Sequence, residues 1–153
     1  MCFMPSLATT TAPTLTPFGP DVPGIILFAP RHYKPSELAE KFTLPHHAEI
    51  GLVKGCGCWL RHVETSPSSA TQEDLVQSPD YDPAPTQENH DALANFLEKH
   101  FQQDGFVEFY GCNAHETADP PKERLELPVE AICHPHFHFR VGTVYRLTFD
   151  RRL

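Results

Sequence analysis

Alternating histidines near the C-terminal end of the chain are the residues whose types and spacing best suit chemistry. They lie in residues 133–139, which read CHPHFHF. An extended backbone there would put the three imidazoles on one face of a strand. Imidazole nitrogens and cysteine thiolates are ligands that zinc and copper prefer, so the pattern predicts a transition-metal site with zinc as the first candidate. The expected ligands are His134, His136, His138, Cys112 and His115.

A purely structural interpretation of the same stretch stays open. Phe137 and Phe139 alternate with the histidines. Burial of these two phenyl rings would by itself place the imidazoles on the solvent side of a strand. Pro135 cannot donate a hydrogen bond to a neighbouring strand, which favours the edge of a sheet over its centre.

Two cysteines separated by a single glycine form a second candidate site. Cys56 and Cys58 stand in the sequence GCGC. Thiols this close could form a strained, reducible disulfide, which predicts a thiol redox protein. They are too close for the Cys-x₂-Cys knuckle of a zinc finger, and no second pair matches them. The alternative is that Cys58 is a small buried residue and that Cys56 lies in a turn.

No catalytic motif stands out. The sequence contains no Gly-rich nucleotide-binding loop, no Gly-x-Ser-x-Gly elbow and no His-Glu-x-x-His. Cys112, Asn113 and His115 supply the residue types of a cysteine nucleophile and its base, but ten histidines and five cysteines make such neighbours common by chance. We therefore expect a small binding or interaction domain that is not an enzyme. Metal binding and thiol redox activity are the alternatives.

The composition narrows the class of partner. The net charge is −8, and the 12 Lys and Arg residues are scattered, which argues against a nucleic-acid partner. No apolar stretch reaches the roughly 18 residues of a membrane span, so a membrane protein is not expected. Five cysteines, an odd number, do not suggest a secreted disulfide framework, so we expect a cytoplasmic protein with reduced thiols. The remaining partners are a protein or a small molecule.

The first half of the chain combines irregular segments with one expected hairpin. Residues 1–23 are rich in Thr and Pro without an apolar period, which predicts a flexible N-terminal arm ahead of a single domain at 24–153. Strand-like runs at 48–54 and 58–64 flank a Gly-Cys-Gly turn and predict a hairpin. Residues 65–85 hold many Pro and Ser residues and predict a mobile loop.

The second half shows the clearest helix. Apolar residues at spacings of three and four predict a helix from Thr86 to residue 104, and Gly105 suits its C-terminal cap. Strands joined by short turns favour an α+β fold, in which two helices pack on one face of a mostly antiparallel sheet. The nearest named architecture is ferredoxin-like. The other expected elements are a helix at 35–42, a helical turn at 128–132, and strands at 24–29, 106–112, 125–127 and 136–149.

Three short motifs carry a resemblance to known proteins. They are GCGCW at 55–59, FVEFYGC at 106–112 and FHFR at 137–140. Together they resemble a group of small bacterial proteins of no known activity, which have a Cys-Gly-Cys-Gly-aromatic hairpin, a helix, a Val-Glu-Leu-Tyr-x-Cys strand and a closing Phe-x-Phe strand. The resemblance spans roughly residues 24–149 and implies a compact domain and no particular chemistry. The chain departs from the group at Asn113 and in its three alternating histidines.

Overall fold

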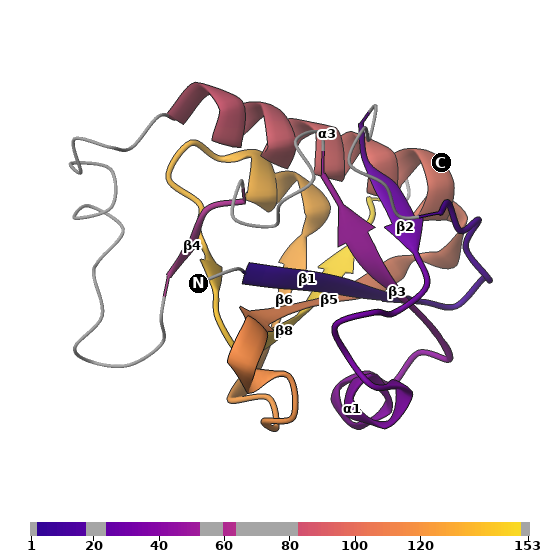
Figure 1. The fold of residues 1–153 in the computed structure, drawn as a ribbon. Coiled ribbons are helices and arrows are strands. Elements are labelled where there is room, and N and C mark those ends of the chain that lie inside the picture. Colours follow the sequence, from indigo (N-terminus) through magenta and orange to yellow (C-terminus); the bar gives the residue numbers. More distant parts are fainter. Residues whose placement is uncertain (1–2, 18–23, 53–59, 64–82, 151–153) are drawn as a thin grey trace.

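A six-stranded sheet forms the centre of the molecule (Figure 1). The structure, a computed structural model, describes residues 3–17, 24–52, 60–63 and 83–150. The strand order is β2-β3-β1-β5-β8-β6, and β4 and β7 form a separate two-stranded sheet. Neighbouring strands of the large sheet are antiparallel except β6 and β8, which are parallel. The predicted α+β class with a mostly antiparallel sheet is therefore confirmed.

Most of the predicted elements are present. The strands are β1 Phe3–Thr9, β2 Ile26–Phe28, β3 His46–Gly51, β4 His62–Val63, β5 Phe106–Asn113, β6 Glu123–Pro128, β7 Phe139–Arg140 and β8 Thr143–Thr148. The helices are α1 Pro35–Lys41 and α3 Pro83–Phe101, with 3₁₀ turns η2 Gln102–Asp104, η3 Ala114–Glu116 and η4 Val129–Cys133. Helix α3 begins at Pro83 and not at Thr86, since proline suits the first turn of a helix. The rest of the predicted loop, residues 65–82, lies outside the described residues.

The first strand corrects the expectation of a flexible N-terminal arm. Residues 3–9 form β1, which lies between β3 and β5, and Phe3 and Leu7 have no exposed surface. A proline such as Pro5 is rare in a central strand, because it cannot donate a ladder hydrogen bond. The register explains why it is tolerated: β3 pairs only with residues 6–9, so β1 has β5 as its one neighbour at Pro5.

In the described residues, the two arms of the predicted hairpin, at 48–54 and 58–64, do not pair with each other. Strand β3 has β1 on one side and β2 on the other, so both of its edges are occupied. Strand β4 pairs instead with β7, in parallel, and the amide of Phe139 donates to the carbonyl of Arg61 at 2.9 Å. The glycine-rich turn itself, residues 55–57, lies outside the described part of the chain.

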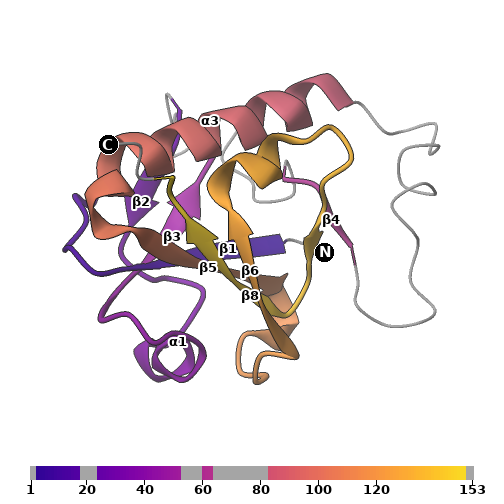
Figure 2. The ribbon, with the colours of Figure 1, turned by 180° about the vertical axis from the view of Figure 1, so that it is seen from behind.

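The two helices lie on opposite sides of the sheet and not on one face (Figures 1 and 2). Side chains that alternate along β5 show why. Tyr110 faces α1, where the ammonium of Lys41 lies 5.3 Å from the centre of its ring. Phe109 faces the other side and stacks on Phe139 at 4.1 Å, and Phe139 stacks on His90 of α3 at 5.5 Å. The ferredoxin-like arrangement is not confirmed, because this sheet has six strands and a parallel pair at one edge.

Two buried carboxylates hold the ends of α1 against the sheet. Oε1 of Glu49, on β3, accepts the backbone N–H groups of residues 31–33 at 2.8, 2.7 and 3.1 Å. Oε1 of Glu108, on β5, accepts those of residues 43–44, both at 2.8 Å. Both glutamates are 2% exposed. Charge-assisted bonds to amides can offset the cost of burying a carboxylate, so the loops on either side of α1 are fixed by strands far away in the sequence.

Glu49→Ala should therefore destabilise the protein strongly. The change leaves three backbone N–H groups without their acceptor, and we expect the free energy of unfolding to fall by about 3 kcal/mol. Urea denaturation followed by circular dichroism measures it. Glu40→Ala is the matched control, since Glu40 is exposed on α1 and its loss should change little. Similar midpoints for E49A and the wild type would contradict this role of Glu49.

Candidate functional site

The five residues predicted as metal ligands do not gather at one point, although the ring centres of His134 and His136 lie 5.6 Å apart. Cys112 is 1% exposed, and its Sγ lies 3.2 Å from the hydroxyl of Tyr33, on the α1 side of the sheet. His115 lies in η3, with an exposed side chain whose Nε2 is 3.4 Å from Oε1 of Glu116. Among the described residues, no group of three or more His, Cys, Asp and Glu side chains is placed to hold a metal ion.

The histidine stretch is a turn and not an extended strand. The amide of Phe137 donates to the carbonyl of His134 at 2.9 Å, which closes a tight turn before β7 begins. His134 and His136 are exposed, whereas His138 is 8% exposed, so the three imidazoles do not share one face. The structural interpretation accounts for the phenylalanines, because Phe139 has no exposed surface and Phe137 packs against the core.

Cys56 and Cys58, the predicted redox pair, lie outside the described residues. The two cysteines that the structure describes are both free: Cys112 is buried and Cys133 is half-buried. Burial is the main cause that raises the pKa of each thiol, to about 11 for Cys133. Since the thiolate is the nucleophile, the raised pKa of Cys112 argues against it as the nucleophile predicted from Cys112, Asn113 and His115.

A buried arginine organises the region around the histidine turn. The guanidinium of Arg61 donates to the carbonyls of Phe137 at 2.9 Å and His134 at 3.0 Å, and to Oε1 of Gln87 at 2.9 Å. Its backbone N–H donates to Nε2 of His90 at 2.9 Å. The arginine is 4% exposed and thus connects the turn to α3 from inside the protein.

His90 extends this network to η4. Its Nδ1 lies 2.9 Å from the carbonyl of Ile132, and a carbonyl can only accept, so Nδ1 carries the proton. Nε2, which accepts from Arg61, is then unprotonated and the ring is neutral. Burial, together with the charge of Arg61, lowers the pKa of His90 to about 3. The imidazole is a structural link between three segments.

His138 has one ring nitrogen that remains without a hydrogen bond among the described residues. Its Nδ1 lies 3.1 Å from the carbonyl of His136, and Nε2 is buried and has no partner there. Burial lowers the pKa of His138, so the neutral ring is favoured. A single imidazole next to the Arg61 guanidinium is a poor centre for a cation.

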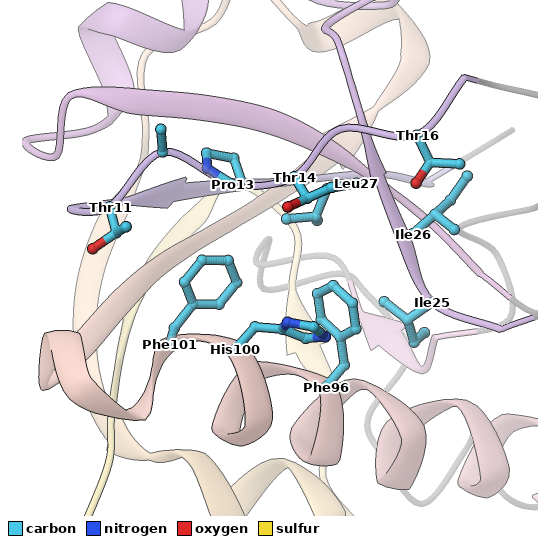
Figure 3. Close-up of a pocket in the computed structure, with 11 residues that line it drawn as sticks. Thr11, Pro13, Thr14, Thr16, Ile25, Ile26, Leu27, Phe96, His100 and Phe101 are labelled. Carbon is cyan, nitrogen blue, oxygen red and sulfur yellow. The ribbon is translucent and has the colours of Figure 1, made fainter.

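The better candidate is a pocket between the end of α3, β2 and the segment 11–16, here called the α3 pocket (Figure 3). Its volume is about 220 Å³. One wall carries the rings of Phe96, His100 and Phe101, which rise from α3 toward the segment 11–16. The rings of Phe96 and His100 are tilted against each other at a distance of 4.5 Å. The other walls are formed by Thr11, Ala12, Pro13, Thr14, Thr16, Ile25, Ile26 and Leu27.

The segment 11–16 is held at both ends, so the pocket has a fixed outer wall. At one end, Asp104 of η2 accepts the backbone N–H of Thr11 at 3.2 Å and its hydroxyl at 2.7 Å. At the other end, the amide of Thr16 donates to the carbonyl of Leu27 at 2.7 Å. This segment belonged to the expected flexible arm, and His100 fell within the predicted helix without a binding role, so both walls were missed. The spacing of Phe96, His100 and Phe101 along the helix was the one available signal.

No family model, curated protein or solved structure matches the chain. The resemblance to small bacterial proteins therefore stays a prediction. In the described part of the chain, no helix combines the length and the apolar character that crossing a membrane requires.

The burial of His90 predicts a loss of stability in mild acid. An unfolded histidine takes up a proton as the pH falls through about 6.5, whereas folded His90 stays neutral down to about 3. Between these two pH values the unfolded state binds more protons than the folded state. The free energy of unfolding therefore decreases as the pH is lowered. We expect His90 to account for a loss of about 2 kcal/mol between pH 7 and pH 5.

Urea denaturation of the wild type and of His90→Gln across this pH range measures the effect. The variant should be less stable at pH 7, and the difference from the wild type should shrink by pH 5. Leu97→Ala serves as the control, because it also removes buried contacts of α3 but no titrating group. Parallel pH curves for H90Q and the wild type would show that His90 is not the cause.

Proposed function

We propose that the protein is a small binding domain and that the α3 pocket is its ligand site. The observation that carries this proposal is a wall of three rings that faces a chain segment fixed at both ends. Preformed concave sites with apolar walls and a few polar groups are typical of small-molecule binding. The expectation of a binding domain and not an enzyme is kept in this proposal.

The lining side chains indicate a small, uncharged ligand with a flat ring. Among the described residues, no carboxylate, ammonium or guanidinium group lines the pocket. Rings of Phe96, His100 and Phe101 offer stacking and edge contacts to an aromatic ligand, and the threonines opposite can hydrogen bond to polar substituents. A volume of about 220 Å³ is below the usual range for drug-sized ligands, so the ligand should have the size of indole or phenol.

Binding of indole, used as a probe, tests this proposal. In a titration of the ¹⁵N-labelled chain followed by NMR, indole should saturate and shift the amides of residues 25–27 and 96–101. His100→Ala should weaken binding by about fivefold, because it removes one ring of the wall. Lys99→Ala is the matched control, since Lys99 is the exposed preceding residue and does not line the pocket. Shifts that do not saturate, or equal weakening by both variants, would contradict the proposal.

Two further expectations from the sequence stay predictions. A thiol redox function of Cys56 and Cys58 depends on residues that the structure does not describe. The cytoplasmic location depends on the odd number of cysteines.

A further inference from the structure

A second pocket, here called the β8 pocket, lies on the side of the sheet that carries α1. It has a volume of about 290 Å³ and lies over β8 and β6, next to the residues that follow α1. Val144 forms part of its apolar floor and is 2% exposed. Unlike the α3 pocket, it is lined by charged side chains of both signs. These are Glu108, Arg124, Glu126 and Arg146.

Two opposite charges in this pocket remain unpaired, although the sheet places them side by side. Arg146 of β8 is the register partner of Glu126 on β6 and of Glu108 on β5. Such neighbours on one face usually attract each other. The guanidinium of Arg146 instead lies over the ring of Phe106 at 4.2 Å. Among the described residues, neither Arg146 nor Glu126 forms an ion pair within 4 Å.

The other two charges are already engaged. Oε1 of Glu108 accepts two backbone N–H groups, and its Oε2 lies 3.9 Å from Nη1 of Arg124. Nη2 of Arg124 donates to the carbonyl of Lys41 at 2.7 Å. Arg124 and Glu108 therefore balance each other at one end of the pocket. Arg146 and Glu126 keep one positive and one negative charge available.

We propose that the β8 pocket binds a small zwitterion of the α-amino acid type. The carboxylate of the ligand pairs with the guanidinium of Arg146, whose planar fork suits a carboxylate. Its ammonium group pairs with Glu126, and an aliphatic side chain covers Val144. A ligand with only a negative charge would be repelled by the two glutamates, and a ligand with only a positive charge would be repelled by the two arginines. Only a ligand with both charges matches the lining.

An NMR titration with L-leucine and two matched analogues tests the proposal. The analogue 4-methylpentanoate lacks the ammonium group, and 3-methylbutylamine lacks the carboxylate. L-leucine should shift the amides of residues 124–126 and 144–146 in a saturable way, and each analogue should bind at least about tenfold more weakly. Equal binding of either analogue would overturn the proposal, as would the absence of shifts at these residues.

Substitution of the two charged residues tests whether Arg146 and Glu126 bind the charged groups of the ligand. Arg146→Gln and Glu126→Gln should each weaken the binding of L-leucine by about tenfold. Both residues are exposed, so neither change should disturb the fold. Glu130→Gln, at an exposed position of η4, is the control and should bind like the wild type. Wild-type affinity in R146Q or E126Q would overturn the proposal, and the indole titration of the α3 pocket is independent of either result.

Discussion

A guanidinium group buried in the protein is the constraint on which the region around α3 depends. Arg61 is 4% exposed and has no carboxylate partner among the described residues. A buried charge is costly unless its hydrogen bonds are satisfied. Arg61 meets this condition by donating to two carbonyls of the histidine turn and to Gln87 of α3. Since these acceptors belong to separate segments, the arginine can be buried only when the turn, α3 and β4 are all in place.

The aromatic core next to this network follows from the same constraint. With the turn fixed by Arg61, Phe139 enters the core and stacks on Phe109 of the large sheet at 4.1 Å. Tyr145 packs edge-on against Phe139 at 5.4 Å, and its hydroxyl accepts the amide of Arg140 at 2.7 Å. The short β4–β7 sheet is thus attached to the large sheet through rings and not through shared strands. The same arrangement leaves His134 and His136 exposed while His138 is buried, and the described residues contain no set of three metal ligands.

An element could be predicted from the sequence when the pattern that defines it lies within its own residues. The stripe of α3 at Leu93, Leu97 and Phe101 is periodic, and the structure buries all three side chains. Strands β5, β6 and β8 also carry their apolar residues in their own sequence. Strand β1 has no such pattern, because its position between β3 and β5 depends on pairing with residues more than 30 positions away. The hairpin prediction was wrong for the same reason: a turn sequence favours local pairing, but β1 and β2 occupy both edges of β3.

The candidate sites were harder to predict because the buried charged side chains of the described residues bind mainly to backbone groups. All four buried charged side chains of the described residues, Lys41, Glu49, Arg61 and Glu108, hydrogen bond to backbone groups. Residue type alone therefore pointed to chemistry at the histidine turn, where the structure has a turn whose carbonyls hold Arg61. The groups that remain free to bind a ligand are exposed side chains around pockets, such as His100 and Arg146. Their neighbours in space come from distant segments, so only the fold brings each set together.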